Sequence, residues 1–89
     1  MTIQRNEAAR RFETEIEGKL SLLEYRIAGR SIVFTHTEVP AEIAGRGVAS
    51  ALTKAGLEYA RAQQLQVVPQ CPFVRDYLVK HSEYSDLLH

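Results

Sequence analysis

The amino-acid sequence predicts an α+β fold in which an antiparallel meander of strands precedes a helix–strand–helix segment. Up to Pro40, apolar and polar residues alternate in short runs, which is typical of strands. After Pro40 the apolar residues recur at the spacing of an amphipathic helix. Prolines and most glycines fall between these runs, where turns are expected.

Three strands are expected before Pro40. The first covers residues 11–16, the second starts near Leu20, and the third covers 31–39 and is rich in β-branched and aromatic residues. Short turns at residues 17–19 and 28–30 separate them, so they are spaced as a meander. The sequence also allows a further strand around residues 2–3.

Beyond Pro40 the sequence predicts a helix from Gly47 to about Gln63, then a short buried strand at 65–68. A second helix is expected from Pro72 to about His81, because proline favours the first helical position. A strand–helix–strand unit makes its two strands parallel neighbours, so the sheet should be mixed. The predicted apolar stripe of the first helix consists of Val48, Leu52, Ala55, Tyr59 and Ala62, and the tail should dock Leu87 and Leu88.

Length and charge restrict the possible partners. The chain has 89 residues, with 11 basic and 11 acidic side chains and a formal net charge of zero. One domain over residues 1–89 is therefore expected, and it lacks the basic surface that nucleic acids or anionic membranes attract. A single cysteine excludes a disulfide scaffold and a cysteine-based zinc site, and it suits the cytoplasm. We expect no metal, and a monomer or a weak homodimer formed through an edge strand.

The segment from Val39 to Ala49 lies between the third strand and the first helix and contains Gly45 and Gly47. The first turn of a helix has backbone N–H groups without partners and a partial positive charge. Glycines at this position let a phosphate approach the backbone closely, and Arg46 can add a charged contact. The alternative is that the two glycines only shape a tight loop.

Cys71 is a second candidate, because it is expected at the N-cap of the second helix. There the helix dipole and free N–H groups favour the thiolate, although a lone cysteine can equally be an inert core residue. Cys71 and the Gly45–Gly47 loop both follow the carboxyl ends of parallel strands, where ligands bind in such sheets.

His36 and Glu38 are candidates for a general base. Strict alternation puts them on the same strand face as Ile32 and Phe34, next to the glycine loop. The alternative is a solvent-exposed pair at a strand end, or a hydrogen-bonded histidine in the core. Among the tyrosines, only Tyr77 is a further catalytic candidate.

Four segments together resemble those of a known family. They are His36-Thr37-Glu38-Val39-Pro40, Gly45-Arg46-Gly47-Val48-Ala49, Val68-Pro69-Gln70-Cys71-Pro72-Phe73-Val74 and Tyr77-Leu78. In combination and order they resemble the small YjdJ-type branch of the GNAT N-acetyltransferases, over about residues 12–88. The resemblance implies a reduced GNAT fold without the opening helices of larger members.

The resemblance also implies acetyl-CoA as cofactor and an amine of a small molecule or protein as acceptor. It implies that the strand end near Val39 holds the pantetheine arm, and that a strand N–H polarises the thioester carbonyl. Cys71 would lie near the cofactor sulfur, and His36 or Glu38 would deprotonate the amine. The cofactor pyrophosphate would lie on the backbone of Gly45, Arg46, Gly47, Val48 and Ala49.

The sequence departs from larger members of the family at two positions. Larger members carry Gln or Arg where this chain has Glu42, and a tyrosine where it has Leu78. An acyl-CoA sensor without turnover is the alternative function, and a plain interaction domain is a weaker third.

Overall fold

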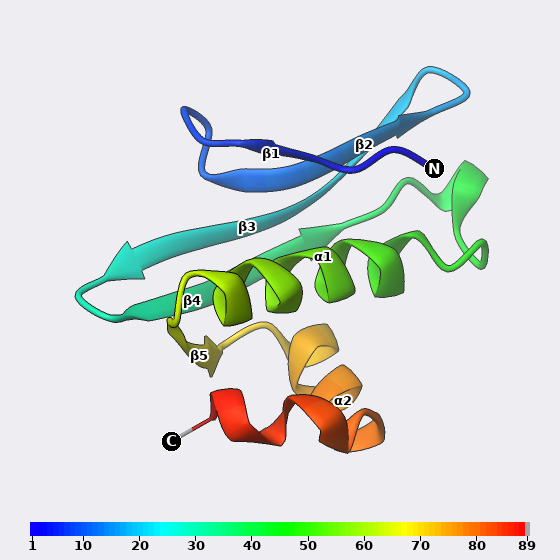
Figure 1. The fold of residues 1–89 in the computed structure, drawn as a ribbon. Helices are drawn as coiled ribbons and strands as arrows, with labels where there is room; N and C mark the ends of the chain where they lie inside the picture. Colours follow the sequence, from blue (N-terminus) through cyan, green and yellow to red (C-terminus); the bar gives the residue numbers. More distant parts are fainter. Residues whose placement is uncertain (89) are drawn as a thin grey trace.

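A mixed five-stranded sheet with the strand order β1-β2-β3-β4-β5 forms the centre of the computed structural model (Figure 1), which describes residues 1–88. Strands β1 to β4 pair antiparallel in sequence order, and β5 pairs parallel to β4. This confirms the α+β class, the antiparallel meander and the mixed sheet. The first strand lies at 4–6 instead of 2–3, because there it pairs with residues 11–13 of β2. The strands are β1 (Gln4–Asn6), β2 (Arg11–Ile16), β3 (Lys19–Ala28), β4 (Ser31–Glu38) and β5 (Gln66–Pro69).

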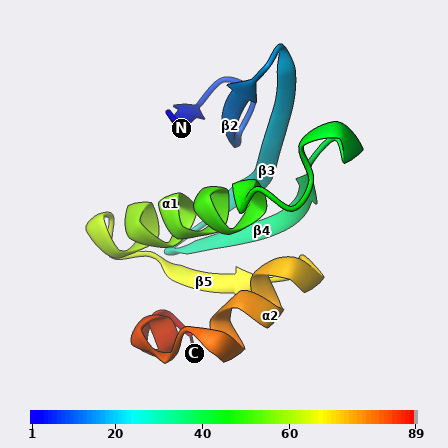
Figure 2. The same cartoon turned by 90° about the vertical axis from the view of Figure 1, so that its right-hand side faces the viewer.

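Two α-helices pack against this sheet. Helix α1 (Val48–Ala62) connects β4 to β5, and α2 (Pro72–Lys80) follows β5. Figures 1 and 2 both place α1 along one face of the sheet and α2 beyond β5, next to α1. Pro72 takes the first helical position after an N-cap at Cys71, as expected. Two short 3₁₀ helices, η1 (Ala41–Ile43) and η2 (Ser82–Leu87), were not predicted.

Gly56 brings α1 unusually close to the sheet. A Cβ atom added at Gly56 would lie 2.8 Å from Cε1 of Phe34 and 3.3 Å from Cδ2 of Leu23. Both of these side chains are fully buried, so the helix backbone itself forms part of the core. The buried side of α1 therefore differs from the predicted stripe: Ala55 and Tyr59 are half-buried and Ala62 is exposed. The buried residues of α1 are Val48, Leu52, Thr53, Gly56, Leu57 and Ala60.

A β-bulge in β4 changes which side chains face α1. Tyr25 of β3 pairs with Phe34, but Glu24 pairs with His36, so Thr35 is an extra residue in β4. The bulge reverses the alternation beyond Phe34. Thr37, which pairs with the core residue Leu23, then shares the face of Phe34. The predicted common face of His36, Glu38, Ile32 and Phe34 is therefore wrong: His36 and Glu38 lie on the opposite face, and both are exposed.

The segment after α2 docks on α1. Leu87 is buried and Leu88 is half-buried against the core, which confirms the predicted docking of both leucines. Arg61 of α1 donates two hydrogen bonds to the carboxylate of Asp86, at 2.8 and 3.1 Å. Such bidentate pairs fix the orientation of the two elements more firmly than single contacts do.

The hydroxyl of Tyr84 in η2 donates a hydrogen bond to Oε2 of Glu58 at 2.5 Å. This bond and burial raise the pKa of Tyr84 from 10.0 to about 12. Folding thus favours the neutral phenol, so this stabilisation is complete below pH 10 and is lost as the pH rises through about 12. We expect Tyr84→Phe to be less stable below pH 10 and to lose less further stability between pH 10 and 12. Urea denaturation over this range measures both effects, and parallel declines of wild type and variant would contradict the assignment.

Candidate functional site

A cavity of about 310 Å³ lies where β4 ends and α1 begins. One wall is the loop that precedes α1, and another is the side chain of Phe73 in the first turn of α2. The loop and the start of α2 thus meet at the carboxyl edge of the parallel strands, as predicted. The lining residues are Val39, Ala44, Gly45, Gly47, Val48, Ala49, Ser50 and Phe73.

Backbone amides at the start of α1 face this cavity. The N–H groups in the first turn of a helix have no intrahelical acceptor. Because the N-cap residue here is Gly47, no N-cap side chain accepts a hydrogen bond from them. Gly45 and Gly47 have φ angles of +84° and +75°, which residues with a side chain rarely adopt. Added Cβ atoms would find nothing within 4 Å at either position. The loop therefore presents open backbone and the positive end of a helix dipole to an anionic ligand.

The two charged side chains of the loop are turned to the neighbouring β2–β3 turn. Arg46 forms an ion pair with Glu17, and Glu42 forms one with Lys19 at 3.4 Å. Neither Arg46 nor Glu42 lines the cavity. All four side chains are largely exposed, so each ion pair contributes at most about 1 kcal/mol. Arg46 can exchange Glu17 for a phosphate at small cost.

Cys71 is buried and does not itself line the cavity. Its Sγ lies 3.1 Å from Oγ1 of Thr37, the residue that the β4 bulge turns to the α1 face. Its backbone N–H donates to the carbonyl oxygen of Phe34 at 2.9 Å, which anchors the start of α2 to β4. Thr37 and Cys71 are each two residues from a wall of the cavity, at Val39 and Phe73 respectively. Cys71 is thus two residues from Phe73, which lines the cavity together with Gly45 and Gly47.

The β4–β5 ladder ends before β4 does. The last paired residues are Phe34 and Pro69, and Cys71 makes the next backbone contact to Phe34. From Thr35 to Glu38, β4 therefore has no neighbouring strand on the β5 side among residues 1–88. Peptide groups on that side of β4 remain available to a ligand.

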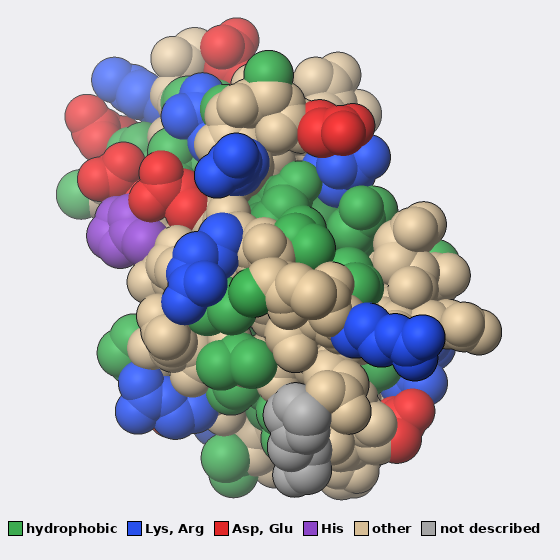
Figure 3. Space-filling model, turned by 90° about the vertical axis from the view of Figure 1, so that its left-hand side faces the viewer, with side chains coloured by type: hydrophobic (Ala, Val, Ile, Leu, Met, Phe, Trp, Pro, Cys, Tyr) green, Lys and Arg blue, Asp and Glu red, His purple; other side chains and the backbone are tan. Residues whose placement is uncertain are grey.

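His36 and Glu38 lie on the sheet face opposite α1, where they are the neighbours of Glu24 and Leu22 in β3. Both are exposed, and neither forms an ion pair with a described residue. Figure 3 shows a histidine with several acidic side chains beside it at the margin of that view. The structure does not bring His36 or Glu38 to the side of the sheet on which Thr37 contacts Cys71.

Tyr77 does not line the cavity at the glycine loop. Its ring stacks on His81 with a centroid distance of 3.8 Å, and burial raises its pKa, with further contributions from Glu83 and Glu58. Its ring centroid lies 6.4 Å from that of Tyr84, whose hydroxyl bonds Glu58 in the second half of α1. Tyr77 therefore belongs to the packing of α2 on the second half of α1.

Sequence reasoning missed two residues of the site. Thr37 contacts Cys71 only because of the bulge, which period-two alternation does not reveal. Phe73 is 38% exposed and lines the cavity. Its position one residue after the predicted helix start at Pro72 could have indicated that it lies at the same sheet edge as the glycine loop. Within residues 1–88, no three His, Cys, Asp or Glu side chains form a group that could hold a metal ion. No helix in this part of the chain has the length and apolar character to cross a membrane.

Comparisons with known proteins agree with this geometry. A family model described as GCN5-related N-acetyl-transferase matches residues 11–87. Proteins named NATD1 from Mus musculus and Homo sapiens are each 30% identical over 79 residues, covering 85% of this chain and 72% and 70% of their own lengths. The NMR structure of a GCN5-like protein from Staphylococcus aureus superposes with a TM-score of 0.78 at 30% identity, covering 99% of this chain and 87% of that one. The chain therefore belongs to the GCN5-related N-acetyltransferase family, in a minimal form whose fold is the one described above.

Proposed function

We propose that this protein transfers the acetyl group of acetyl-CoA to an amine of a small molecule or protein. The observation that carries the proposal is the cavity at the start of α1, where free backbone amides adjoin the unpaired end of β4. Pyrophosphate and an extended amide-containing arm are complementary to these two features: anions bind helix N-termini, and amides pair with an open strand edge.

The residues present fit such a cofactor. Gly45 and Gly47 leave space for phosphate oxygens at the amides of Gly47, Val48 and Ala49, and Arg46 is close enough in sequence to add a charge. Val39, Val48 and Phe73 provide an apolar surface for the arm. When bound there, acetyl-CoA supplies an acetyl group activated as a thioester.

The catalytic contributions of the chain are positioning, polarisation and proton transfer. A free N–H of β4 between Thr35 and Glu38 would polarise the acyl carbonyl. The acceptor amine would approach from the sheet face opposite α1, where His36 and Glu38 can take up its proton. Cys71, which lies beside Thr37, would either donate a proton to the leaving thiolate or accept the acyl group transiently while CoA leaves as the thiol.

Calorimetric titration with acetyl-CoA, followed by a screen of amine acceptors for release of free thiol, tests this proposal. We expect binding and acceptor-dependent thiol release. Binding without thiol release on any acceptor would indicate the alternative, an acyl-CoA sensor. This alternative is favoured by the position of Tyr77, which leaves the cavity without a tyrosine. Absence of binding would leave only an interaction domain.

Intact-protein mass spectrometry distinguishes the two roles of Cys71. If Cys71 accepts the acyl group, incubation with acetyl-CoA should add the mass of one acetyl group to the wild type. The adduct should disappear in Cys71→Ala and persist in Thr37→Val, which keeps the thiol. A wild type that stays unmodified while still releasing thiol would count against acylation of Cys71.

A further inference from the structure

The β2–β3 turn is tied by two ion pairs to the segment that precedes α1. Arg46 of the glycine loop pairs with Glu17, and Glu42 of η1 pairs with Lys19 at 3.4 Å. In Figure 1 the β2–β3 turn and η1 lie at the same end of the molecule. Arg46 stands between the two glycines that line the cavity. The charges of the turn therefore act on the same loop that is proposed to hold the cofactor phosphates.

The conformation of the turn is fixed by two residues with positive φ angles. Ile16 and Lys19 form the last pair of the β2–β3 ladder, so only Glu17 and Gly18 connect the two strands. Their φ angles are +53° and +74°, as in a type I′ turn. Asparagine, aspartate and glycine are the residues usually found at these positions, and a glutamate is uncommon there. The turn is thus short and well defined, and it places Glu17 and Lys19 beside the loop.

The two loop charges have opposite effects on a bound phosphate. The guanidinium of Arg46 attracts a phosphate, but in this structure it is paired with Glu17. The carboxylate of Glu42, three residues before the first loop glycine, repels a phosphate unless a cation neutralises it. Lys19 is the cation that meets this carboxylate. One residue of the turn therefore opposes anion binding at the loop, and another favours it.

Both ion pairs can rearrange when a ligand binds. Their four side chains are between 44% and 65% exposed, and ion pairs at such positions are weak. We propose that the β2–β3 turn tunes the affinity of the loop for coenzyme A. Glu17 competes with the cofactor phosphates for Arg46, and Lys19 cancels the repulsion from the neighbouring carboxylate of η1. This inference rests on the cofactor binding proposed above.

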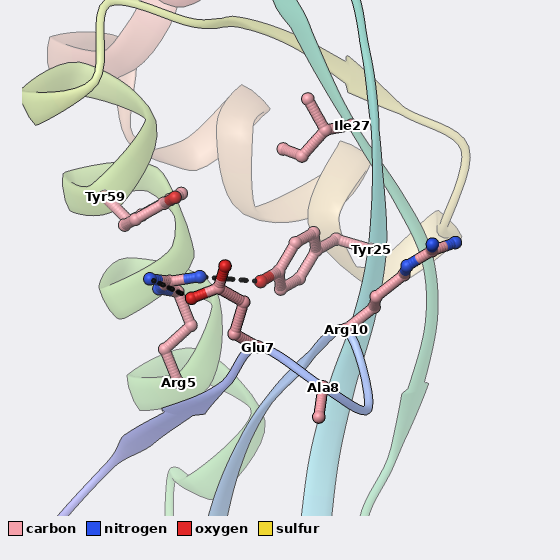
Figure 4. A pocket seen from close by; sticks show the side chains of 7 residues that line it. All are labelled: Arg5, Glu7, Ala8, Arg10, Tyr25, Ile27 and Tyr59. Carbon is pink, nitrogen blue, oxygen red and sulfur yellow. Dashed lines mark hydrogen bonds and ion pairs between the residues drawn. The ribbon is translucent and has the colours of Figure 1, made fainter.

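Another arginine–glutamate pair of the chain provides a matched control. It lies in a cavity of about 540 Å³ that opens between the β1–β2 turn, β3 and the second half of α1 and shares no lining residue with the cavity at the loop. Figure 4 shows Arg5 there, paired with Glu7 at 3.3 Å and donating to the hydroxyl of Tyr25. Glu7 is 80% exposed, so Glu7→Gln removes the same charge from the same kind of pair without touching the loop.

Calorimetric titration with coenzyme A, at low and at high salt, tests the role of the turn. Glu17→Gln should tighten binding about twofold to fivefold, because it releases Arg46. Lys19→Gln should weaken binding by a similar factor. Both effects should shrink at high salt, which screens exposed charges. Glu7→Gln, and Lys80→Gln at the exposed end of α2, should leave the affinity unchanged.

Two double variants identify the partners through which the turn acts. In an Arg46→Gln background, Glu17→Gln should no longer tighten binding. In a Glu42→Gln background, Lys19→Gln should no longer weaken it. Such loss of effect is the signature of residues that act through one another. All four positions are exposed, so these variants should keep the fold, and a merely structural role of the turn would not produce opposite changes in affinity.

Either of two results would overturn the proposal: single variants that change the affinity in the same direction, or single variants that do not differ from their controls. Effects that persist unchanged in the double variants would overturn it as well. Coenzyme A carries no acetyl group, so a failure of acetyl transfer to any amine leaves this test intact. A wild type that does not bind coenzyme A would contradict both the tuning by the turn and the proposed function.

Discussion

Replacement of Gly47 by leucine is expected to weaken acetyl-CoA binding at least about a hundredfold in a calorimetric titration. Gly47 has a φ of +75°, and the space where a Cβ would point contains no protein atom within 4 Å. A leucine side chain would enter the space that a phosphate needs to reach the amides of Val48 and Ala49. Loss of two hydrogen bonds to a charged group at about 1.5 kcal/mol each accounts for a change of this size.

Gly29→Leu is the matched control for this experiment. Gly29 also has a positive φ, +60°, and an added Cβ would likewise meet no atom within 4 Å, but it lies in the β3–β4 turn and does not line the cavity. Both variants carry a backbone strain of about 1–2 kcal/mol, so their stability should fall by similar amounts. If Gly29→Leu weakens binding as much as Gly47→Leu does, the effect is one of stability and the loop is not the cofactor site.

Gly56→Val is expected to produce the largest loss of stability, about 2–3 kcal/mol, with a fall in Tm of roughly 10 °C or more. The first added carbon would lie 2.8 Å from Cε1 and 2.9 Å from Cζ of Phe34, a distance that atoms in a packed core do not tolerate. Phe34 is fully buried and cannot turn away. Helix α1 would have to move off the sheet, and its N-terminal turn would move with it.

Ala62→Val provides the control, because Ala62 is exposed at the end of the same helix. It introduces the same side chain with only the small propensity penalty of a β-branched residue. Thermal unfolding followed by circular dichroism compares the two. Similar Tm values for the two variants would show that α1 does not approach the sheet as closely as the structure has it.

The order of elements could be predicted because it depends on local patterns. Alternating residues before Pro40 and helical spacing after Gly47 identify the strands and α1, and Pro72 marks the start of α2. The close approach of α1 at Gly56 could not be predicted, because it depends on Phe34 from a different element. For the same reason the buried side of α1 is rotated relative to the stripe that apolar spacing suggested.

At the candidate site, the positions of the glycine loop and of Cys71 at the starts of α1 and α2 could be predicted, because they are local features of strand and helix ends. The bulge at Thr35 depends on pairing with Glu24 and Tyr25 in β3, which no local pattern encodes. It moved His36 and Glu38 to the opposite face and brought Thr37 to Cys71. A one-residue insertion in one strand thus determines which side chains of β4 lie on the face that α1 covers.

Because of this bulge, the two faces of the sheet at β4 have different roles in the proposed reaction, one toward the cofactor and one toward the acceptor. The face with Thr37 and Cys71 adjoins the cavity at the start of α1, and the face with His36 and Glu38 is open to an acceptor. An amine approaching from the second face would meet the acyl carbon without crossing the core.

The most direct test is to follow the acetyl group itself. Acetyl-CoA labelled with ¹³C at the acetyl carbonyl is incubated with the wild-type protein and a panel of amines, and the carbonyl resonance is observed by NMR. The proposed function predicts that, with at least one amine, the signal moves from the thioester position to the amide position, and that Gly47→Leu slows this conversion. A label that remains on the thioester with every amine, or that appears only as free acetate, would contradict acetyl transfer to an amine.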